Sequence, residues 1–139
     1  MRVREWMSPD PVTVTPSTTV REARRLLRHY GIRHLPVLGR DGSLAGIVSD
    51  RDLRLDDDTI EALAHGVPAA ELGLDREVEA VMSSPVHTIG ADEPIDAAAR
   101  LMLSRRVSAL PVLDDAGALA GLLTTTDCLL ASLEPAAAR

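Results

Sequence analysis

The sequence predicts an α/β (α+β) fold made of two tandem β-α-β-β-α repeats that pack with pseudo-two-fold symmetry. The first observation behind this prediction is a duplication. Residues 35–52 read LPVLGRDGSLAGIVSDRD and residues 110–127 read LPVLDDAGALAGLLTTTD, at a constant offset of 75. Nine matched positions are identical, which chance periodicity does not explain. They are Leu35/Leu110, Pro36/Pro111, Val37/Val112, Leu38/Leu113, Gly42/Gly117, Leu44/Leu119, Ala45/Ala120, Gly46/Gly121 and Asp52/Asp127.

The second observation is the local pattern inside each copy. A short apolar run centred on Val is followed by a turn that ends in Gly, by a second apolar run, and then by a hydroxyl and a carboxylate. This order is typical of a strand, a hairpin, a second strand and a polar loop. The hairpin turns are expected at Asp41-Gly42 and Ala116-Gly117, because Gly tolerates the positive φ angles of tight hairpins.

The polar loop is expected to begin the last helix of each repeat. Asp50 in the first copy and Thr125 in the second can each cap a helix N-terminus. Asp52 and Asp127 would then lie in a first helical turn, where free backbone N–H groups and a carboxylate converge.

The elements in front of each hairpin repeat at the same offset. Short strands are expected at residues 12–14 and 86–89. A helix then follows in each copy, indicated by a capping box of Thr19 with Glu22 in the first copy and by Pro94 in the first turn of the second. Apolar residues recur at helical spacing in both copies, and Gly31 is expected to end the first helix.

These elements divide the chain into a first repeat at residues 1–65, a linker at residues 66–77 and a second repeat at residues 78–139. Neither repeat alone can cover its small sheet, so two are needed for a core. Residues 59–65 are expected to form a helical extension. The acidic residues of 56–77 are typical of a solvated helix and linker, with an acidic partner surface as the alternative.

Composition narrows the function classes. The 139 residues are 45% hydrophobic, which suffices for a core, and the net charge of −6 with a pI near 5.1 argues against a nucleic-acid or anionic-membrane surface. No apolar run approaches the ~20 residues that span a bilayer, and residues 1–11 are too charged for a secretory signal. A single cysteine, Cys128, excludes an internal disulfide and a cysteine-based metal site. A cytoplasmic protein without a metal site is expected.

The paired motifs resemble a known family. An apolar LPV strand, a hairpin, and Gly-apolar-apolar-Ser/Thr-x-x-Asp, present twice in register, strongly resemble the CBS domain, named after cystathionine β-synthase, which occurs as tandem pairs. The resemblance covers residues 3–133, nearly the whole chain, and indicates a stand-alone CBS pair. It implies a regulatory module that binds adenosine-containing ligands such as AMP, ADP, ATP or S-adenosylmethionine in the cleft between the copies and signals to an unidentified regulated protein, with no required cofactor.

The resemblance also implies which residues bind. Asp52 and Asp127 would accept hydrogen bonds from ribose hydroxyls. The other implied contacts are loop side chains that bind ribose or phosphate, backbone at the starts of the first hairpin strands, and two segments that flank adenine. The loop side chains would be Ser49, Arg51, Thr124 and Thr126. The backbone positions would be Arg33, His34, Leu35, Ser108, Ala109 and Leu110. The segments beside adenine would be Pro11 with Val12 and Val86 with His87.

The chemistry of these residues supports ligand binding but leaves an alternative open. A carboxylate only accepts hydrogen bonds, and vicinal hydroxyls donate them, so Asp suits a ribose. Copy one adds three groups that can offset a phosphate charge, Arg33, His34 and Arg51, whereas copy two has Ser108, Ala109 and Thr126 at the matching places. Unequal sites are therefore expected. The alternative is that both Asp residues only cap helices.

Two other functions compete with ligand sensing. An enzyme is not expected, because the sequence has no GxxxxGK, GxSxG, HExxH or CxxC motif. A ligand-free interaction module is the second rival, because CBS pairs commonly form homodimers through their helices. The apolar residues available for a homodimer here are Leu26, Leu27, Leu101, Leu129, Leu130 and Leu133.

Overall fold

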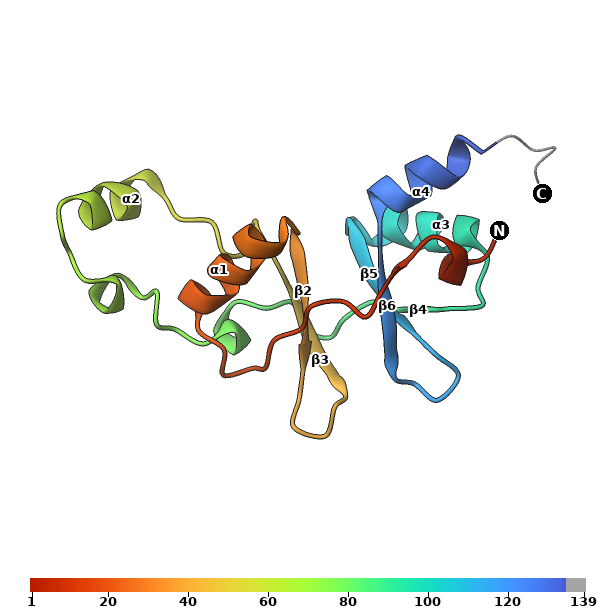
Figure 1. Cartoon of the computed structure of the whole chain (residues 1–139), viewed down its shortest axis with the longest axis horizontal. Coiled ribbons are helices and arrows are strands. Elements are labelled where there is room, and N and C mark those ends of the chain that lie inside the picture. Colours follow the sequence, from red (N-terminus) through yellow and green to blue (C-terminus); the bar gives the residue numbers. More distant parts are fainter. Residues whose placement is uncertain (135–139) are drawn as a thin grey trace. The chain divides into compact units, whose positions relative to one another are not determined.

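The computed structural model describes residues 1–134 and confirms a mixed α/β fold (Figure 1). Contacts divide the chain into two compact units. One unit joins Met1–Pro11 to Val86–Arg139, of which residues 135–139 lie outside the described part, and the other consists of Val12–Pro85. The units do not coincide with the sequence repeats, because the first eleven residues pack with the second repeat.

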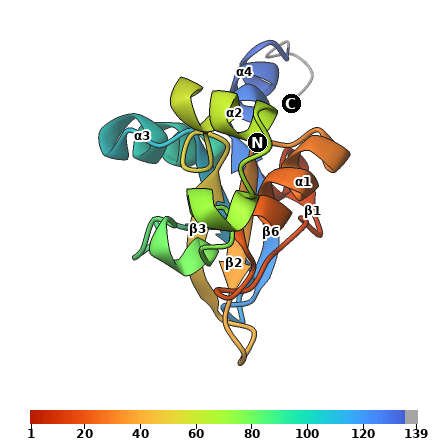
Figure 2. The same ribbon diagram turned by 90° about the vertical axis from the view of Figure 1, so that its left-hand side faces the viewer.

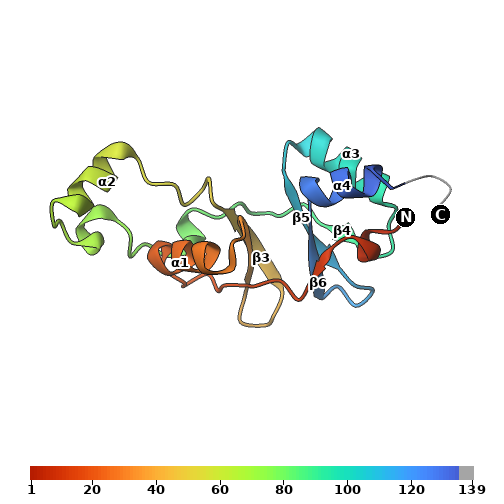
Figure 3. The same ribbon diagram turned by 45° about the horizontal axis from the view of Figure 1, so that its top comes forward.

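The unit that contains the second repeat is built on a four-stranded sheet of order β1-β6-β5-β4. The hairpin strands β5 and β6 are antiparallel, with Pro111 opposite Leu122, and β4 runs parallel to β5. Two helices accompany the sheet, and α3 contacts α4 (Figure 3). The element bounds are η1 (Val3–Glu5), β1 (Ser8–Pro9), β4 (Ile89–Gly90), α3 (Ile95–Arg105), β5 (Ala109–Leu113), β6 (Leu119–Thr124) and α4 (Thr125–Ser132).

The unit that contains the first repeat has the same plan with shorter outer strands. Its hairpin strands β2 and β3 pair antiparallel (Figure 2), and the two outer positions are reduced to single bridges, Val14 with Val37 and Ile47 with Ser83. The expected strand at residues 12–14 is therefore one bridged residue, and the strand expected at 86–89 begins only at its last residue. The elements are α1 (Val20–Tyr30), β2 (His34–Leu38), β3 (Leu44–Ser49), α2 (Asp57–Ala64), η2 (Ala69–Leu72) and η3 (Val78–Ala80).

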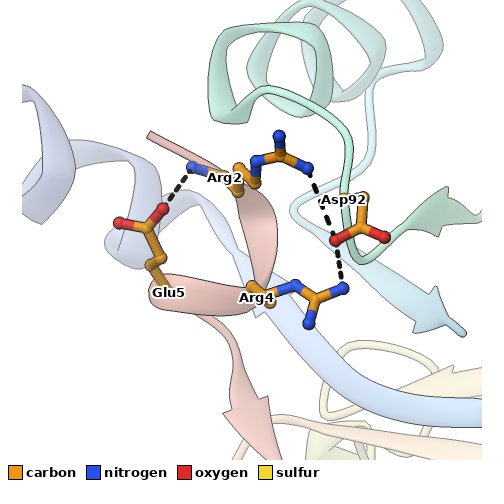
Figure 4. A network of polar contacts seen from close by, with 4 residues as sticks. All are labelled: Arg2, Arg4, Glu5 and Asp92. Carbon is orange, nitrogen blue, oxygen red and sulfur yellow. Dashed lines mark hydrogen bonds and ion pairs between the residues drawn. The ribbon is translucent and has the colours of Figure 1, made fainter.

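A short leading segment anchors each unit in the same way. In the second-repeat unit, Val3 N donates a hydrogen bond to Glu93 O at 2.9 Å. Arg4 pairs with Asp92, and the guanidinium of Arg2 lies 3.6 Å from the same carboxylate (Figure 4). These contacts hold η1 against the start of α3.

The first-repeat unit repeats this anchor 75 residues further along. Val78 N donates to Thr18 O at 2.8 Å, and an Arg21–Asp75 ion pair lies beside it. Since residues 78–85 belong to the second sequence repeat, the two repeats exchange their leading segments.

One glycine in each hairpin permits this exchange. A Cβ atom on either glycine would approach a methionine side chain and a backbone carbonyl oxygen more closely than real Cβ atoms do. The glycines are therefore required by close backbone approach. The two sets are Gly46 under Met82 and Ser83, and Gly121 under Met7 and Ser8.

The helix signals are confirmed at α1. The side chain of Thr19 accepts a hydrogen bond from Glu22 N at 3.1 Å, whereas the Glu22 carboxylate pairs with Arg25 and does not complete the capping box. Gly31 ends the helix at φ +62°. The equivalent residue after α3 is Arg106, which takes the same left-handed conformation at φ +56°.

The last helix is the main difference between the repeats. In the second repeat, α4 begins where expected, although its N-cap is Thr124 rather than Thr125. In the first repeat, the expected helix at Asp52 is wrong: residues 50–53 form a turn, and a helix resumes only at α2, capped by Asp56. The prediction of a helical extension over residues 59–65 is confirmed in substance by α2.

The burial of one position in α4 explains the break. Ala131 is 1% exposed and packs in the core of its unit. Its equivalent in the first repeat is Asp56, so a continued helix would place an ionised carboxylate in that core, at a cost of several kcal/mol. The chain instead turns outward, and Asp56 accepts a hydrogen bond from Thr59 N at 2.7 Å.

Candidate ligand-binding site

Each repeat places a hydroxyl and a carboxylate in a closed set of hydrogen bonds at the end of its second hairpin strand. In the first repeat, Asp52 Oδ2 accepts from Ser49 N at 2.9 Å and from Ser49 Oγ at 3.0 Å. Asp52 N donates to Ser49 Oγ at 3.2 Å. We call this set the Ser49/Asp52 box.

The second repeat has the same construction, the Thr124/Asp127 box. Asp127 Oδ2 accepts from Thr124 N at 2.8 Å and from Thr124 Oγ1 at 3.2 Å, while Asp127 N donates to Thr124 Oγ1 at 3.4 Å. This box caps α4, whereas its counterpart closes a single turn. The capping role considered from the sequence is therefore present at Asp127, whereas Asp52 begins no helix.

The hydrogen bonds of each box use only one oxygen of its carboxylate. Among the described residues, none donates a hydrogen bond to Oδ1 of Asp52 or Asp127. Asp52 is exposed and Asp127 is half-buried. Each box thus holds a carboxylate in a fixed orientation with one oxygen available as an acceptor, as a ribose hydroxyl would require.

Strand pairing brings further predicted residues to the first box. His34 lies directly opposite Ser49 in the β2–β3 ladder, and Asp50 N donates to Arg33 O at 2.8 Å. Arg51 is exposed within the same turn. Arg33, His34 and Arg51 therefore gather around the Ser49/Asp52 box within one unit.

The second box has the same neighbours by position but not by charge. Ala109 lies opposite Thr124, and Thr125 N donates to Ser108 O at 3.0 Å. Thr126 is exposed in the first turn of α4. None of these residues is cationic, so the structure retains the asymmetry that the sequence indicates.

The protonation of His34 reflects its position at the strand end. Burial lowers the pKa of the imidazole, and the neighbouring carboxylates of Asp50 and Asp52 act in the opposite direction. Asp50 was not singled out from the sequence as a neighbour of this imidazole. His34 pairs with Ser49 in the β2–β3 ladder, so the next residue, Asp50, lies near His34. The sequence could have indicated this neighbour once the register of the hairpin was assigned.

The remaining predicted residues fall into two groups. Leu35 and Leu110 are completely buried, so neither side chain is available to a ligand. The segments of Pro11 with Val12 and Val86 with His87 lie where the chain passes from one compact unit to the other, and three of these four side chains are half-buried, His87 being exposed. Whether these residues bind stays a prediction.

Comparison with known proteins identifies the family. A family model described as "CBS domain" matches residues 3–55 and 78–134. A CBS domain-containing protein of Dictyostelium discoideum is 36% identical over 127 residues, covering 91% of this chain and 88% of that protein. The chain therefore belongs to the CBS-domain family and contains a tandem pair of these domains.

Several relatives carry the pair within a larger enzyme. The homoserine O-acetyltransferase of Methanosphaerula palustris is 36% identical over 123 residues, which cover 88% of this chain but 22% of the enzyme. The similarity to that enzyme thus concerns a minor part of its length.

Solved structures show the same fold with ligands bound. CBSX2 in complex with AMP matches with a TM-score of 0.75 and 31% identity, covering 95% of this chain and 96% of that one. The CBS domain pair of MJ0100, in complex with 5′-methylthioadenosine and S-adenosyl-L-methionine, matches with a TM-score of 0.76 and 28% identity, covering 96% and 98%.

The described residues contain neither a helix suited to cross a membrane nor a cluster of side chains suited to hold a metal ion. Among residues 1–134, no helix is both long and apolar enough to cross a membrane. In the same part of the chain, no three His, Cys, Asp or Glu side chains form a group that could hold a metal ion.

Proposed function

We propose that this CBS pair binds an adenosine-containing ligand and passes its occupancy to a partner protein. The observation that carries the proposal is the pair of equivalent boxes, each presenting an oriented Asp with one oxygen available. The ligands of the AMP-bound and S-adenosylmethionine-bound relatives share a ribose, which is the group that such a carboxylate suits.

Within this proposal the two repeats have different roles. Next to the Ser49/Asp52 box in the chain or the strand ladder are Arg33 and Arg51, whose guanidinium groups can offset the charge of a phosphate, and His34, whose imidazole can donate a hydrogen bond to it. The Thr124/Asp127 box lacks such groups and suits a nucleoside or a ligand with a cationic sulfonium centre. The first repeat would therefore bind phosphorylated ligands more tightly.

A thermal-shift screen with AMP, ADP, ATP, adenosine and S-adenosylmethionine tests the proposal. A ligand that is present at a hundred times its Kd should add about 2.7 kcal/mol to the free energy of unfolding. Asp52→Ala should reduce the shift caused by AMP, while Asp41→Ala, an exposed acid in the β2–β3 turn, should not. No shift with any of these ligands would contradict adenosine binding.

A second candidate function is an interaction module whose helices form a homodimer. Four leucines on or just after α3 and α4 are half or more exposed: Leu103 at 81%, Leu129 at 66%, Leu130 at 50% and Leu133 at 77%. Apolar surface gathered on adjacent helices is typical of an interface. Leu103 was not among the predicted residues, and Leu27, which was, is a core residue.

The homodimer is tested by sedimentation velocity on the wild type and on Leu129→Glu/Leu133→Glu. We expect a dimer that the double variant dissociates, while the matched Arg25→Glu/Arg28→Glu variant on α1 remains dimeric. A wild-type protein that is monomeric at all concentrations would contradict the homodimer.

We further propose that the protein is a cytoplasmic regulator without catalytic activity. Turnover of any nucleotide by the purified protein would contradict this proposal.

A further inference from the structure

One turn of the first repeat carries an acidic residue that the second repeat lacks. Asp50 N donates a hydrogen bond to Arg33 O at 2.8 Å. At the equivalent place in the second repeat, Thr125 N donates a hydrogen bond to Ser108 O at 3.0 Å. The backbone is therefore built in the same way at both positions, and the main chemical difference between them is the negative charge of Asp50.

The charge of Asp50 acts at the end of the β2–β3 ladder, beside the Ser49/Asp52 box. Burial lowers the pKa of the His34 imidazole, whereas the carboxylates of Asp50 and, more weakly, Asp52 raise it. Arg33 has the smallest effect on this pKa and lowers it. Two carboxylates and one guanidinium group therefore lie within electrostatic range of the same ring, and Asp50 acts on it more strongly than Asp52 does.

The carboxylate of Asp50 is not held in an ion pair. Asp52 accepts two hydrogen bonds from Ser49, which orient its carboxylate for a ribose. Asp50 is exposed, and it forms no ion pair with any of the residues that the structure describes. Its charge is therefore available to act on a charged ligand at the Ser49/Asp52 box.

A phosphate group near this box would meet charges of both signs. The guanidinium groups of Arg33 and Arg51 favour a phosphate, and the carboxylate of Asp50 opposes it. A phosphate monoester carries a charge of about −1.5 to −2 at pH 7, and further phosphates in a chain add to that charge. Repulsion by Asp50 is therefore absent for adenosine, present for AMP and larger for ATP.

We infer that Asp50 sets the ligand preference of the first repeat, because its charge weakens the binding of ATP more than the binding of AMP. The second repeat lacks this selection at the equivalent position, since Thr125 is neutral. The inference rests on the proposed binding of adenosine-containing ligands and adds which of them the first repeat disfavours. Asp50 would thus be a residue that determines specificity, whereas Asp52 would bind the ribose.

Isothermal titration calorimetry with adenosine, AMP and ATP, in buffer without divalent cations, tests the inference on the full chain. Asp50→Asn should tighten ATP about fivefold and AMP about twofold, and should leave the affinity for adenosine unchanged. The gain for ATP should shrink at high salt, because salt screens exposed charges. Asp50→Glu keeps the charge and should keep the wild-type ratio of ATP to AMP affinity. Asp41→Asn, which removes an exposed acid from the β2–β3 turn, should change no affinity.

A second measurement needs no nucleotide. In the ligand-free protein, Asp50→Asn should lower the pKa of His34 in an NMR titration, because the carboxylate stabilises the charged imidazole, and Asp41→Asn should leave it unchanged. If the wild type binds no nucleotide, the proposed function fails as well. If the wild type binds nucleotides, the inference alone is overturned by an unchanged ratio of ATP to AMP affinity in Asp50→Asn, by an equal gain in Asp41→Asn, or by an unchanged pKa of His34.

Discussion

The two compact units carry the same motif and differ in the segment that comes after it. In one, the Thr124/Asp127 box continues directly into α4, and Ala131 reaches the core. In the other, the Ser49/Asp52 box closes one turn, and the chain leaves to form α2 with Asp56 as its cap. We infer that this one buried position decides whether the turn becomes a packed helix.

The largest change in stability is expected when the aspartate of the first repeat is introduced at the equivalent position of the second repeat. Ala131→Asp would bury a carboxylate in the α4 contact and should lower the free energy of unfolding by about 3 kcal/mol or more. The loss should shrink as pH falls toward 4, because a neutral carboxyl is less costly to bury. Urea unfolding measures both effects.

The neighbouring Ser132→Asp is the control for Ala131→Asp. Ser132 is exposed on the same helix, so we expect a change within about 0.5 kcal/mol. If the two variants lose the same amount of stability, burial of position 131 does not explain the difference between the repeats.

The close approach of the leading segments should be equally important in both units. Gly46→Ala and Gly121→Ala would each push a methionine and a carbonyl oxygen away and should cost about 1–3 kcal/mol. Gly39→Ala is the matched control, because an added Cβ there meets first the flexible side chain of Asp41. Costs below about 0.5 kcal/mol at both glycines would show that the segments do not press on the hairpins.

The boxes should differ in their contribution to stability. Thr124→Ala removes the N-cap of an eight-residue helix and should cost about 1 kcal/mol, within the roughly 0.5–2 kcal/mol seen for such caps. Ser49→Ala interrupts a single turn and should cost less. Chemical denaturation of both variants compares them, and a greater loss in Ser49→Ala would contradict the role assigned to α4.

The smallest difference between the two repeats is expected at the C-terminal ends of α1 and α3. Arg106 has the left-handed conformation that Gly31 has in the first repeat, and that conformation is unfavourable for residues with a Cβ. Arg106→Gly should raise the free energy of unfolding by about 0.5–1 kcal/mol, and Gly31→Ala should lower it by a similar amount. Thermal unfolding would show opposite signs, and shifts of the same sign would reject this interpretation.

The sequence could predict most features that depend on local pattern. Both hairpins, the cap at Thr19 and the end of α1 at Gly31 follow from apolar alternation, a hydroxyl before Glu22 and a glycine at a left-handed position. The juxtaposition of His34 with Ser49 follows from the hairpin as well.

Features that depend on tertiary packing could not be read from the chain. The helix break at Asp56 requires knowledge that Ala131 is buried, since Leu53, Arg54 and Leu55 are themselves compatible with a helix. The exchange of leading segments depends on contacts between residues far apart in the sequence. The sequence around Gly46 does not indicate which segment lies against this glycine.

The most direct test of unequal sites is isothermal titration calorimetry with AMP and adenosine on the wild type, Asp52→Ala and Asp127→Ala. Loss of a charged acceptor should weaken binding at its own box about ten- to a hundredfold, since such a hydrogen bond contributes about 1.5–3 kcal/mol. We predict that Asp52→Ala weakens AMP much more than Asp127→Ala does, whereas adenosine is affected similarly by both. Equal loss of AMP affinity in the two variants would contradict the claim that the cations of the first repeat make the sites unequal.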